Sequence, residues 1–204
     1  MQNNEQEENI EKKSYTKIML LFVVIALVSF LIYTYNSMIK KEEEVRVAWS
    51  QVESNIQRKF DLLPNLVKVV QGYAKHEKEL FTTIASLRSE ANKTLQPSSD
   101  TVQQVKNAQV LQGKLNRSLM QLFAVVENYP DLKASQSFLT LQAQIEGSEN
   151  RINITRMIYN EAVGEFNAFI RKIPANMLAT LGGFSKKEYF KAESDAKKTL
   201  DLGL

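Results

Sequence analysis

Apolar side chains recur every three or four positions along most of the chain, which is the spacing of one buried face of an α-helix. The pattern is strictest in residues 138–173, where an apolar residue occupies every seventh position: Phe138, Ile145, Ile152, Tyr159, Phe166 and Ile173. A straight helix drifts by about 20° per seven residues, so this spacing predicts helices that coil around one another with a left-handed twist. We therefore expect an all-α fold of long, closely packed helices.

Four prolines divide the chain beyond residue 35 into intervals that each hold one amphipathic pattern: Pro64, Pro97, Pro130 and Pro174. Because proline lacks an amide donor and clashes with the preceding turn, it belongs in loops or in first helical turns. The intervals predict four long helices, over about 36–60, 61–91, 101–126 and 132–173. Short connections then favour an antiparallel four-helix bundle. If Pro64 only kinks a continuous helix, the first two helices become one rod, and the bundle has three helices over most of its length.

A short helix is predicted to follow the bundle. Gly182 and Gly183 supply the backbone freedom of a turn, and Ser185 and Glu188 have the spacing of a capping box, in which each side chain bonds a free amide at a helix start. The predicted helix covers residues 185–200, and its two aromatic residues are expected to pack against the end of the bundle.

Residues 18–35 are the most apolar stretch of the chain and are long enough to cross a membrane. They predict a single transmembrane helix between a disordered polar tail, residues 1–17, and the helical domain, residues 36–204. A cleaved signal peptide is the alternative, but no small-x-small cleavage site follows the apolar run. Basic residues are equally frequent on the two sides of the run, so they do not select an orientation.

Ionisable residues fall at inward positions of the helical pattern. If Ile152 and Tyr159 lie on one edge of the buried seam, Glu149 and Arg156 lie on the other edge and point inward. Glu77 occupies a core position of the second predicted helix. Because an unpaired buried charge is strongly destabilising, we expect a network in which Arg156 lies between carboxylates. Four further residues border the seam at intervals of seven: Glu146, Asn153, Asn160 and Asn167.

This polar network has a structural and a functional interpretation. Buried polar groups in coiled helices fix which faces meet, so register and specificity are the first interpretation. A catalytic or partner-binding site is the second. Di-iron sites in helical bundles need Glu-x-x-His on two helices, whereas this chain has one histidine, His76, without a glutamate three residues before it. We therefore predict no catalytic residue, no metal and no cofactor, and we keep the network as a candidate partner-binding signature.

Charge and composition exclude further classes. The 26 basic and 23 acidic residues are interspersed and give a formal charge of +3, without the basic face that nucleic-acid binding requires. The chain has no cysteine, so neither a disulfide nor a catalytic thiol is available. The phosphate-binding loop, the Gly-x-Ser-x-Gly elbow and the His-Glu-x-x-His zinc motif are also absent from the sequence.

Five segments, in order, resemble the LemA family of bacterial membrane proteins: QRKFDLLPNLV, GYAKHEKELF, ENYPDLKASQSFLTLQAQIEGSENRI, RMIYNEAVGEFN and IPANMLATLGGF. The resemblance implies a mainly antiparallel helical bundle at the bacterial cytoplasmic membrane, with the short N-terminal tail outside and the bundle in the cytoplasm. It implies no established activity, substrate or cofactor. Six motif residues of the family coincide with the polar network: Glu77, Glu149, Asn150, Arg151, Tyr159 and Asn160.

Three functions are compatible with the sequence. We favour a non-enzymatic, membrane-tethered module that binds other membrane or envelope proteins as an adaptor or regulator, and that can also form a homo-oligomer. The second hypothesis is a hydrolase that uses Glu77, Glu149 and Arg156. The third is lipid binding by the last helix, in which five lysines surround Phe190: Lys186, Lys187, Lys191, Lys197 and Lys198.

Overall fold

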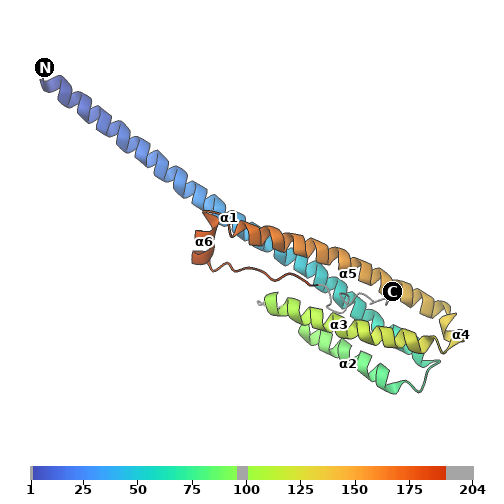
Figure 1. Ribbon diagram of the computed structural model, residues 1–204. Helices are drawn as coiled ribbons and strands as arrows, with labels where there is room; N and C mark the ends of the chain where they lie inside the picture. Colours follow the sequence, from blue (N-terminus) through green and yellow to red (C-terminus); the bar gives the residue numbers. More distant parts are fainter. Residues whose placement is uncertain (1, 96–100, 192–204) are drawn as a thin grey trace, which may run out of the picture. The chain divides into compact units, whose positions relative to one another are not determined.

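The computed structural model of the protein describes residues 2–95 and 101–191, with side chains for all of these except residues 2–14 and 101. The predicted all-α class is confirmed, because these residues form helices, turns and short connections and contain no strand (Figure 1). Six helices occur in the described part of the chain: α1 (Gln2–Gln71), α2 (Lys78–Thr94), α3 (Thr101–Val126), α4 (Pro130–Lys133), α5 (Gln136–Phe169) and α6 (Ala175–Gly182).

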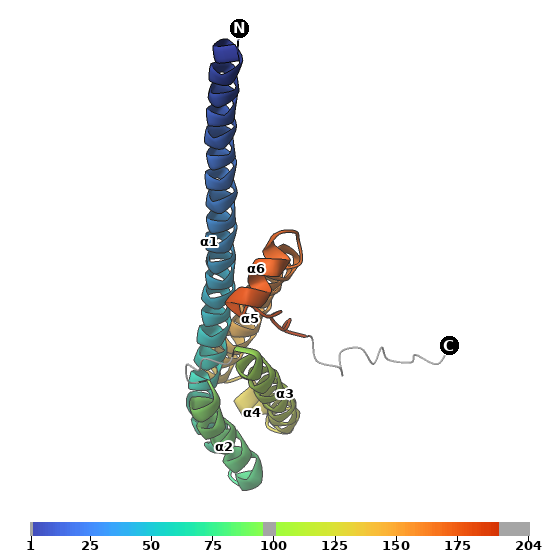
Figure 2. The same ribbon diagram turned by 90° about the vertical axis from the view of Figure 1, so that its left-hand side faces the viewer.

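The described residues fall into two compact units. The first unit comprises residues 2–42 and 166–186, and the second comprises residues 43–95, 101–165 and 187–191. Helices α1 and α5 contribute to both units, whereas α6 belongs to the first unit and α2, α3 and α4 belong to the second (Figure 2). The first unit therefore holds the whole predicted transmembrane segment, and the second holds most of the predicted helical domain.

The apolar part of α1 exposes its side chains. Its most hydrophobic window of 18 residues has a mean hydropathy of 2.6, and 6% of that window is buried. Leu20, Phe22 and Tyr33 are 68%, 68% and 72% exposed. A helix of a water-soluble protein would bury at least one apolar face. Among the described residues, α1 is the one helix that is long and apolar enough to cross a membrane.

A small aromatic cluster organises the end of the first unit. The Phe184 ring contacts the rings of Tyr35 and Phe166, with ring centroids 5.7 and 6.4 Å apart. A Cβ atom at Gly182 would lie 2.8 Å from the Phe184 ring and 3.1 Å from the Tyr35 ring, so a larger residue would have to displace both. Gly183 follows with φ of 73°, a left-handed conformation that ends α6. The turn predicted at the two glycines is confirmed.

The helix break predicted at Pro64 is wrong, and the alternative, a continuous helix through Pro64, is confirmed. The chain turns instead at residues 72–77, so α2 is still a separate helix. A proline inside a helix costs about 3 kcal/mol. The Pro64 ring is exposed, while Phe60, Leu63 and Leu66 around it are at most 1% exposed. Burial of each such side chain contributes about 1.5–3 kcal/mol, and together these contributions outweigh the proline.

Two of the other prolines lie at helix boundaries, as predicted. Pro130 lies in the first turn of α4, and Pro174 directly precedes α6. Helix α5 ends at Phe169 and does not reach residue 173, because the residue before a proline disfavours helical geometry. Ile173 is 84% exposed, so its predicted place in the buried seam is wrong. Pro97 lies outside the described residues.

Helix α1 also includes residues 2–17, for which the composition predicts a disordered tail. This part of the structure differs from the prediction. Glutamate, glutamine and lysine, which are frequent in these residues, have high helix propensity. The adjoining apolar segment is already helical, and an existing helix extends without the cost of a new nucleus.

The short helix predicted over residues 185–200 is wrong where the structure describes it. Residues 184–191 are not helical, so Ser185 and Glu188 do not form a capping box. Residues 192–200 lie outside the described part of the chain. The physical reason lies in tertiary contacts of residues 188–191, which are described below and which require a non-helical backbone.

The apolar seams of the second unit are buried as the sequence predicts. On α5, Phe138, Ile145, Ile152 and Tyr159 are at most 4% exposed. Buried residues of α1 follow the same three- and four-residue steps: Val45, Trp49, Val52, Ile56, Phe60, Leu63, Leu66 and Val70. Those of α3 do likewise: Val105, Ala108, Leu111, Leu115, Leu119, Leu122 and Val126.

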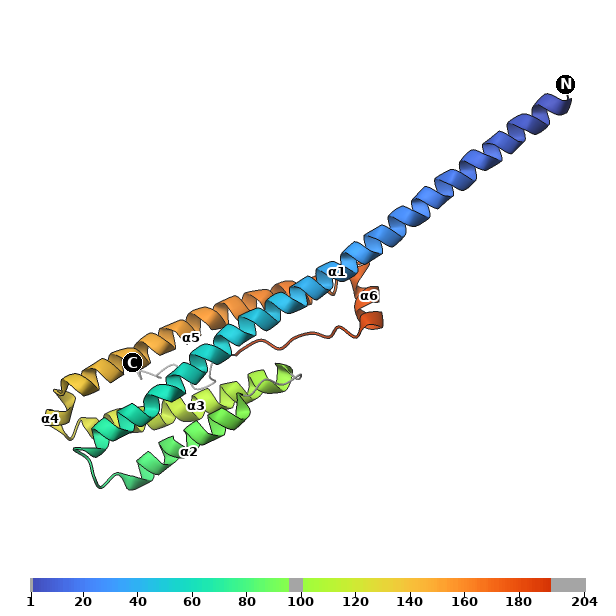
Figure 3. The ribbon, with the colours of Figure 1, turned by 180° about the vertical axis from the view of Figure 1, so that it is seen from behind.

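Helices α1, α2, α3 and α5 run alongside one another in the second unit (Figure 3), and side chains from different helices meet in its core. Trp49 and Lys59 of α1 contact Tyr159 and Glu149 of α5, respectively. As the residue number increases along α1, the number of the residue that it contacts on α5 therefore decreases. Helices α2 and α3 pack side by side. The core therefore lies where α1, α3 and α5 face one another.

Candidate functional site

Residues 187–191, here called the strap, follow α6 in the chain but pack within the second unit (Figure 3). Four consecutive carbonyl groups of the strap, at positions 188 to 191, each accept a hydrogen bond from a helix side chain. The donors, in that order, are Tyr159 Oη, Gln109 Nε2, Asn160 Nδ2 and Arg156 Nη2, at 2.8, 3.3, 2.9 and 3.3 Å. Three donors belong to neighbouring turns of α5 and one belongs to α3, so two helices hold the strap backbone.

Asn160 bonds the strap backbone through both of its polar groups. Its Nδ2 donates to the Phe190 carbonyl at 2.9 Å, and its Oδ1 accepts the Phe190 backbone N–H at 2.8 Å. A carboxamide carries the same donor and acceptor as a peptide group, so the closed pair is equivalent to one step of a β-ladder. This pair needs an extended strap, which explains why the predicted helix is absent there.

Phe190 fixes the strap in the apolar core. It is 3% exposed, and its ring centroid lies 6.2 Å from that of Trp49 on α1. The Arg156 guanidinium carbon lies 4.6 Å from the centroid of the Phe190 ring, a cation–π contact that contributes about 0.5–2 kcal/mol. Trp49 also meets the Tyr159 ring edge-on at 5.4 Å. The buried side chain and the backbone donors therefore share one cluster.

Burial controls the charge state of two groups at this cluster. Desolvation, followed by the nearby Glu188 carboxylate, raises the pKa of Tyr159, so its phenol stays a neutral hydrogen-bond donor. Desolvation also raises the pKa of Glu53, one turn after Trp49 on α1. The Trp49 indole N–H is close enough to oppose this shift in pKa, but neither it nor the buried Glu53 Oε1 has a well-formed hydrogen bond.

A second polar cluster lies in the core of the same unit. Lys59 is 2% exposed, and its ammonium group donates to Glu149 Oε2 at 2.5 Å and to Asn116 Oδ1 at 2.8 Å. Gln112 Nε2 donates to the other Glu149 carboxylate oxygen at 3.4 Å. Helices α1, α3 and α5 thus meet around one buried cation. Lysine is rarely this buried unless it is paired, and here the carboxylate and the amide meet that need.

The predicted polar network forms only in part. Glu149 is half-buried as expected, but its charged partner is Lys59 and not Arg156. Arg156, also half-buried, contacts Phe190 and the strap carbonyl. The prediction paired the inward residues of α5 with one another and with Glu77. It did not include Lys59, a cation from α1.

Glu77 does not occupy a helix core position, and that prediction is wrong. It lies in the turn before α2, where its backbone carbonyl accepts the Phe81 N–H at 3.3 Å. The prediction began the second helix near Pro64. The turn between α1 and α2 lies instead at residues 72–77, so Glu77 falls in this turn and not inside a helix. The side-chain hydrogen bonds from α2 to α1 and α3 involve Asn92 and Glu90, near the opposite end of the helix.

The three asparagines that border the predicted seam have separate environments. Asn153 is exposed and its Oδ1 accepts a hydrogen bond from Arg156 Nη1 at 3.4 Å. Asn160 holds the strap. Asn167 is 9% exposed and belongs to the first unit. The structure therefore brings Asn153, Arg156 and Asn160 together at the strap, one turn after another on α5.

Sequence reasoning missed Lys59, although a signal was present. Lys59 falls in a seven-residue repeat whose neighbouring members are apolar and buried: Val45, Val52 and Leu66. Gln112 falls in the same way between Val105 and Leu119. A polar residue at an apolar position of the repeat is the signal that identified Glu149, and it applies equally to these two positions.

The LemA family profile matches residues 48–202, which is more than half of the chain. The chain belongs to the LemA family. Magnetosome protein MamQ 2 of Paramagnetospirillum magneticum is 29% identical over 185 residues, which cover 82% of this chain and 68% of the relative. Magnetosome protein MamQ of Magnetospirillum gryphiswaldense is 27% identical over 195 residues, with coverages of 85% and 72%. Protein LemA of Metamycoplasma hominis is 25% identical over 162 residues, with coverages of 78% and 71%.

The LemA match begins after the apolar segment and includes both polar clusters of the second unit. Of the six motif residues identified from the family resemblance, Tyr159 and Asn160 hold the strap and Glu149 binds Lys59. The other three lie at exposed positions of α5 or in the turn before α2. Half of this LemA signature thus serves the two clusters.

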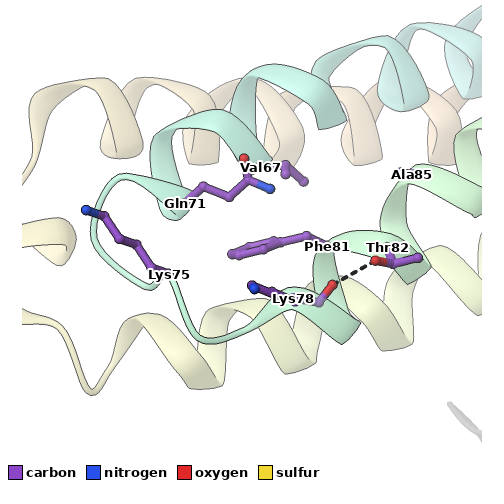
Figure 4. Close-up of a pocket in the computed structure, with 7 residues that line it drawn as sticks. All are labelled: Val67, Gln71, Lys75, Lys78, Phe81, Thr82 and Ala85. Atoms are coloured by element: carbon purple, nitrogen blue, oxygen red, sulfur yellow. Dashed lines mark hydrogen bonds between the residues drawn. The ribbon is translucent and has the colours of Figure 1, made fainter.

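A cavity of about 580 Å³ lies between the end of α1 and the start of α2 (Figure 4). The Phe81 ring lies near its centre, with Gln71 on one side and Lys78 on the other. Its lining contains no carboxylate and no histidine, so it offers no general acid–base pair. Within residues 2–95 and 101–191, no group of three or more histidine, aspartate, glutamate or cysteine residues is placed to hold a metal ion.

Proposed function

We propose that this LemA-family protein is a non-enzymatic, membrane-anchored helical module that binds other membrane or envelope proteins, as an adaptor or regulator. The observation that carries the proposal is the set of side-chain donors that bonds four consecutive carbonyls of the strap. Such an arrangement is suited to holding a polypeptide by its backbone. It contains no pair of groups arranged to make or break a covalent bond.

Membrane anchoring is the first part of the proposal, and the exposed apolar side chains of residues 18–33 support it. Exposure of apolar surface to water is unfavourable by about 25 cal/mol per Å², and lipid removes this penalty. Tyr33 and Tyr35 lie near the end of the run, where aromatic residues favour the membrane interface. Following the family resemblance, we place the anchor in the bacterial cytoplasmic membrane and the second unit in the cytoplasm.

An antiparallel four-helix bundle is the second part of the proposal. We infer that α1, α2, α3 and α5 form it within the second unit. The opposite order of contacting positions on α1 and α5 supports this arrangement. The turn at residues 72–77 allows a reversal of direction between α1 and α2. The buried seven-residue repeats support coiled, left-handed packing.

The hydrolase hypothesis has little support from the site. It needs Glu77, Glu149 and Arg156 to act together, but Glu149 binds Lys59, Arg156 holds the strap, and Glu77 lies in the turn before α2. A carboxylate that is already paired with a buried ammonium group is a poor general base. We therefore infer that the clusters serve packing and binding.

The lipid-binding hypothesis loses its central residue. That hypothesis places Phe190 among the lysines of a lipid-binding last helix, but Phe190 is 3% exposed and packs on Trp49, in a segment that is not helical. Lys197 and Lys198 lie outside the described residues. The strap therefore favours a protein partner over a lipid surface.

Photocrosslinking in the native membrane tests the proposed function. A photoreactive amino acid replaces Met157, which is 66% exposed on α5, and the full chain is crosslinked in intact cells. We expect a discrete set of crosslinked membrane or envelope proteins, and their loss when residues 18–35 are deleted. If the full chain gives no specific crosslink, or if the chain without residues 18–35 gives the same set, the proposal of a membrane-anchored binding module fails.

A further inference from the structure

The strap is bound mainly through atoms that every polypeptide has. Four backbone carbonyls and the Phe190 N–H bond helix side chains, and Phe190 also buries its ring against the helices. Tyr189 is 45% exposed, and Lys191 is exposed as well. A site of this kind recognises an extended backbone that carries one aromatic side chain, and it tolerates varied residues at the flanking positions.

The residues that bind the strap are fixed by helices. Trp49 lies on α1, Gln109 on α3, and Arg156, Tyr159 and Asn160 on α5. Their backbone positions are set by helices whose apolar seams are buried. The strap itself and the residues just before it are not helical, so it can leave without unwinding a helix. The binding groove is therefore preorganised, which lowers the entropic cost of accepting another segment.

We propose that these five residues form a peptide-recognition groove, and that an extended segment of a partner protein, with an aromatic side chain in the place of Phe190, binds there by displacing the strap. This inference rests on the proposed function and adds the site and the chemistry of the partner. The strap is then a competitor within the same chain. Its covalent attachment gives it a high effective concentration, so a partner segment binds well only when its own affinity is high or the strap is weakened.

A polypeptide fits the groove better than other ligands do. The donors from α3 and α5 match acceptors that follow one another at the spacing of backbone carbonyls, and Asn160 requires the N–H and the C=O of a single residue. A lipid chain offers neither this row of carbonyl acceptors nor the paired donor and acceptor. The strap of a second copy of this chain presents the same groups, so exchange between copies is the main competing occupant.

A peptide-binding measurement tests the groove directly. The probe is a fluorescein-labelled peptide with the sequence of residues 185–191, blocked at its C-terminus, and the protein is the full chain in detergent micelles. Fluorescence anisotropy compares the unmodified chain with Phe190→Ala. We expect the probe to bind Phe190→Ala at least about tenfold more tightly, because the weakened strap competes less. A probe with alanine at position 190 should not bind either protein.

A second substitution assigns this binding to the groove. In the Phe190→Ala background, Asn160→Ala should weaken probe binding about tenfold, the loss expected for two neutral hydrogen bonds. Asn150→Ala is the matched control, because Asn150 is the same residue type at an exposed position of α5, and it should change nothing. The proposal is overturned if Asn160→Ala does not weaken probe binding, or if the probe does not bind Phe190→Ala at all.

Two measurements cover the remaining outcomes. If Phe190→Ala does not fold, hydrogen exchange of the unmodified chain is followed with and without excess probe; exchange of the Phe190 amide should accelerate, and unchanged exchange overturns the proposal. If the unmodified chain forms dimers in micelles that dissociate on addition of the probe, the occupant is a second copy, and the choice of a partner protein is overturned.

Crosslinking separates this inference from the proposed function. Asn160→Ala is introduced into the chain with the photoreactive residue at position 157. If the unmodified chain captures partners and Asn160→Ala loses them, both proposals stand. If Asn160→Ala captures the same partners, the groove is rejected while the proposed function survives. If neither chain captures a partner, the proposed function fails whatever the peptide measurement shows.

Discussion

The two polar clusters of the second unit differ in what they hold. Lys59 is a buried cation that bonds side chains of two other helices, and each partner is fixed in its own helix. The strap groove instead bonds the main chain of a segment without secondary structure. Removal of one partner at Lys59 leaves a buried charge unpaired, whereas the groove and strap can each be hydrated if they separate.

This difference separates stability from recognition. A buried ion pair is costly to break and fixes the register of the helices that carry it. A groove whose donors are mostly uncharged, and which holds no fully buried ion pair among the described residues, can exchange one extended segment for another at a modest cost. The two clusters therefore predict opposite outcomes for single substitutions: a large loss of stability at the first, and a local release of the strap at the second.

The largest effect is expected for Glu149→Ala. The substitution leaves the Lys59 ammonium buried with Asn116 as its remaining partner, and breaking a buried pair on one side costs about 3 kcal/mol or more. Urea unfolding of the full chain in micelles measures this cost. Trp49 is the single tryptophan of the chain and lies in the second unit, so its fluorescence reports that unit alone.

Two further variants decide whether the buried charge is the cause. Lys59→Met removes the charge and leaves a Glu149 side chain that is 32% exposed and can be hydrated, so we expect a loss of about 1 kcal/mol or less. Glu90→Ala breaks the ion pair with Lys114, whose side chains are 41% and 43% exposed, and should cost about 0–1 kcal/mol. Equal losses for Glu149→Ala and Lys59→Met would refute the role of the unpaired cation.

The next largest effect is expected for Phe190→Ala. Truncation of a buried phenylalanine in a rigid core costs about 3–5 kcal/mol, but here the loss cannot exceed the free energy that docks the strap, and we expect about 2 kcal/mol. Trypsin cleavage after Lys187 and Lys191 should become faster. Tyr189→Ala, at a residue that is 45% exposed, is the control and should leave cleavage nearly unchanged. Equal cleavage rates for Phe190→Ala and the unmodified chain would contradict a strap held by its aromatic side chain.

Sequence periodicity was sufficient to predict the features that depend on burial alone. The helical class, the α5 seam from Phe138 to Phe166 and the exposed apolar segment all follow from which residues avoid water. Periodicity also placed Glu149 near the core. It could not predict which residue neutralises Glu149, because the partner lies 90 positions away on α1 and the pairing depends on how the helices meet.

The strap could not be predicted because its conformation is imposed by distant residues. Ser185 to Glu188 has the local pattern of a helix start, and that local preference is weak. The bonds from Asn160 and Gln109 connect positions 30 and 80 residues apart in the chain, and they outweigh it. Pro64 is the converse case, in which the chain is helical against its local preference. The proline is a strong local signal for a helix break, but the burial of Phe60, Leu63 and Leu66 outweighs it.

A smaller effect is expected for Asn160→Ala. The substitution removes two neutral hydrogen bonds to the Phe190 backbone, each of which contributes about 0.5–1.5 kcal/mol. Because the freed strap groups can bond water, we expect a net loss of about 1 kcal/mol, with faster exchange of the Phe190 amide. Asn150→Ala should stay within about 0.5 kcal/mol of the unmodified chain. If the Phe190 amide exchanges at the same rate in both variants, Asn160 does not hold the strap.

The smallest effect concerns Glu53, which contrasts with Glu149 because it is a half-buried carboxylate beside an indole and not beside a lysine. Burial raises the pKa of Glu53 above its ordinary value of 4.5, so the folded chain binds this proton more tightly than the unfolded chain. The resulting stabilisation is fully present below the unfolded pKa and is lost as the pH rises through the folded pKa. At pH 7 the ionised Glu53 therefore destabilises the fold.

Glu53→Gln should accordingly raise the free energy of unfolding at pH 7, by less than about 0.5 kcal/mol because water reaches part of the side chain. The gain should shrink at pH 4, where the carboxyl group is largely protonated in the folded chain. Urea titrations followed by Trp49 fluorescence at the two pH values measure this difference, with Glu161→Gln on the exposed side of α5 as the control. A gain of the same size at both pH values would mean that the gain comes from packing or from the amide hydrogen bonds. The difference between Glu149, which is paired with Lys59, and Glu53, which is not paired with a lysine, would then not depend on charge.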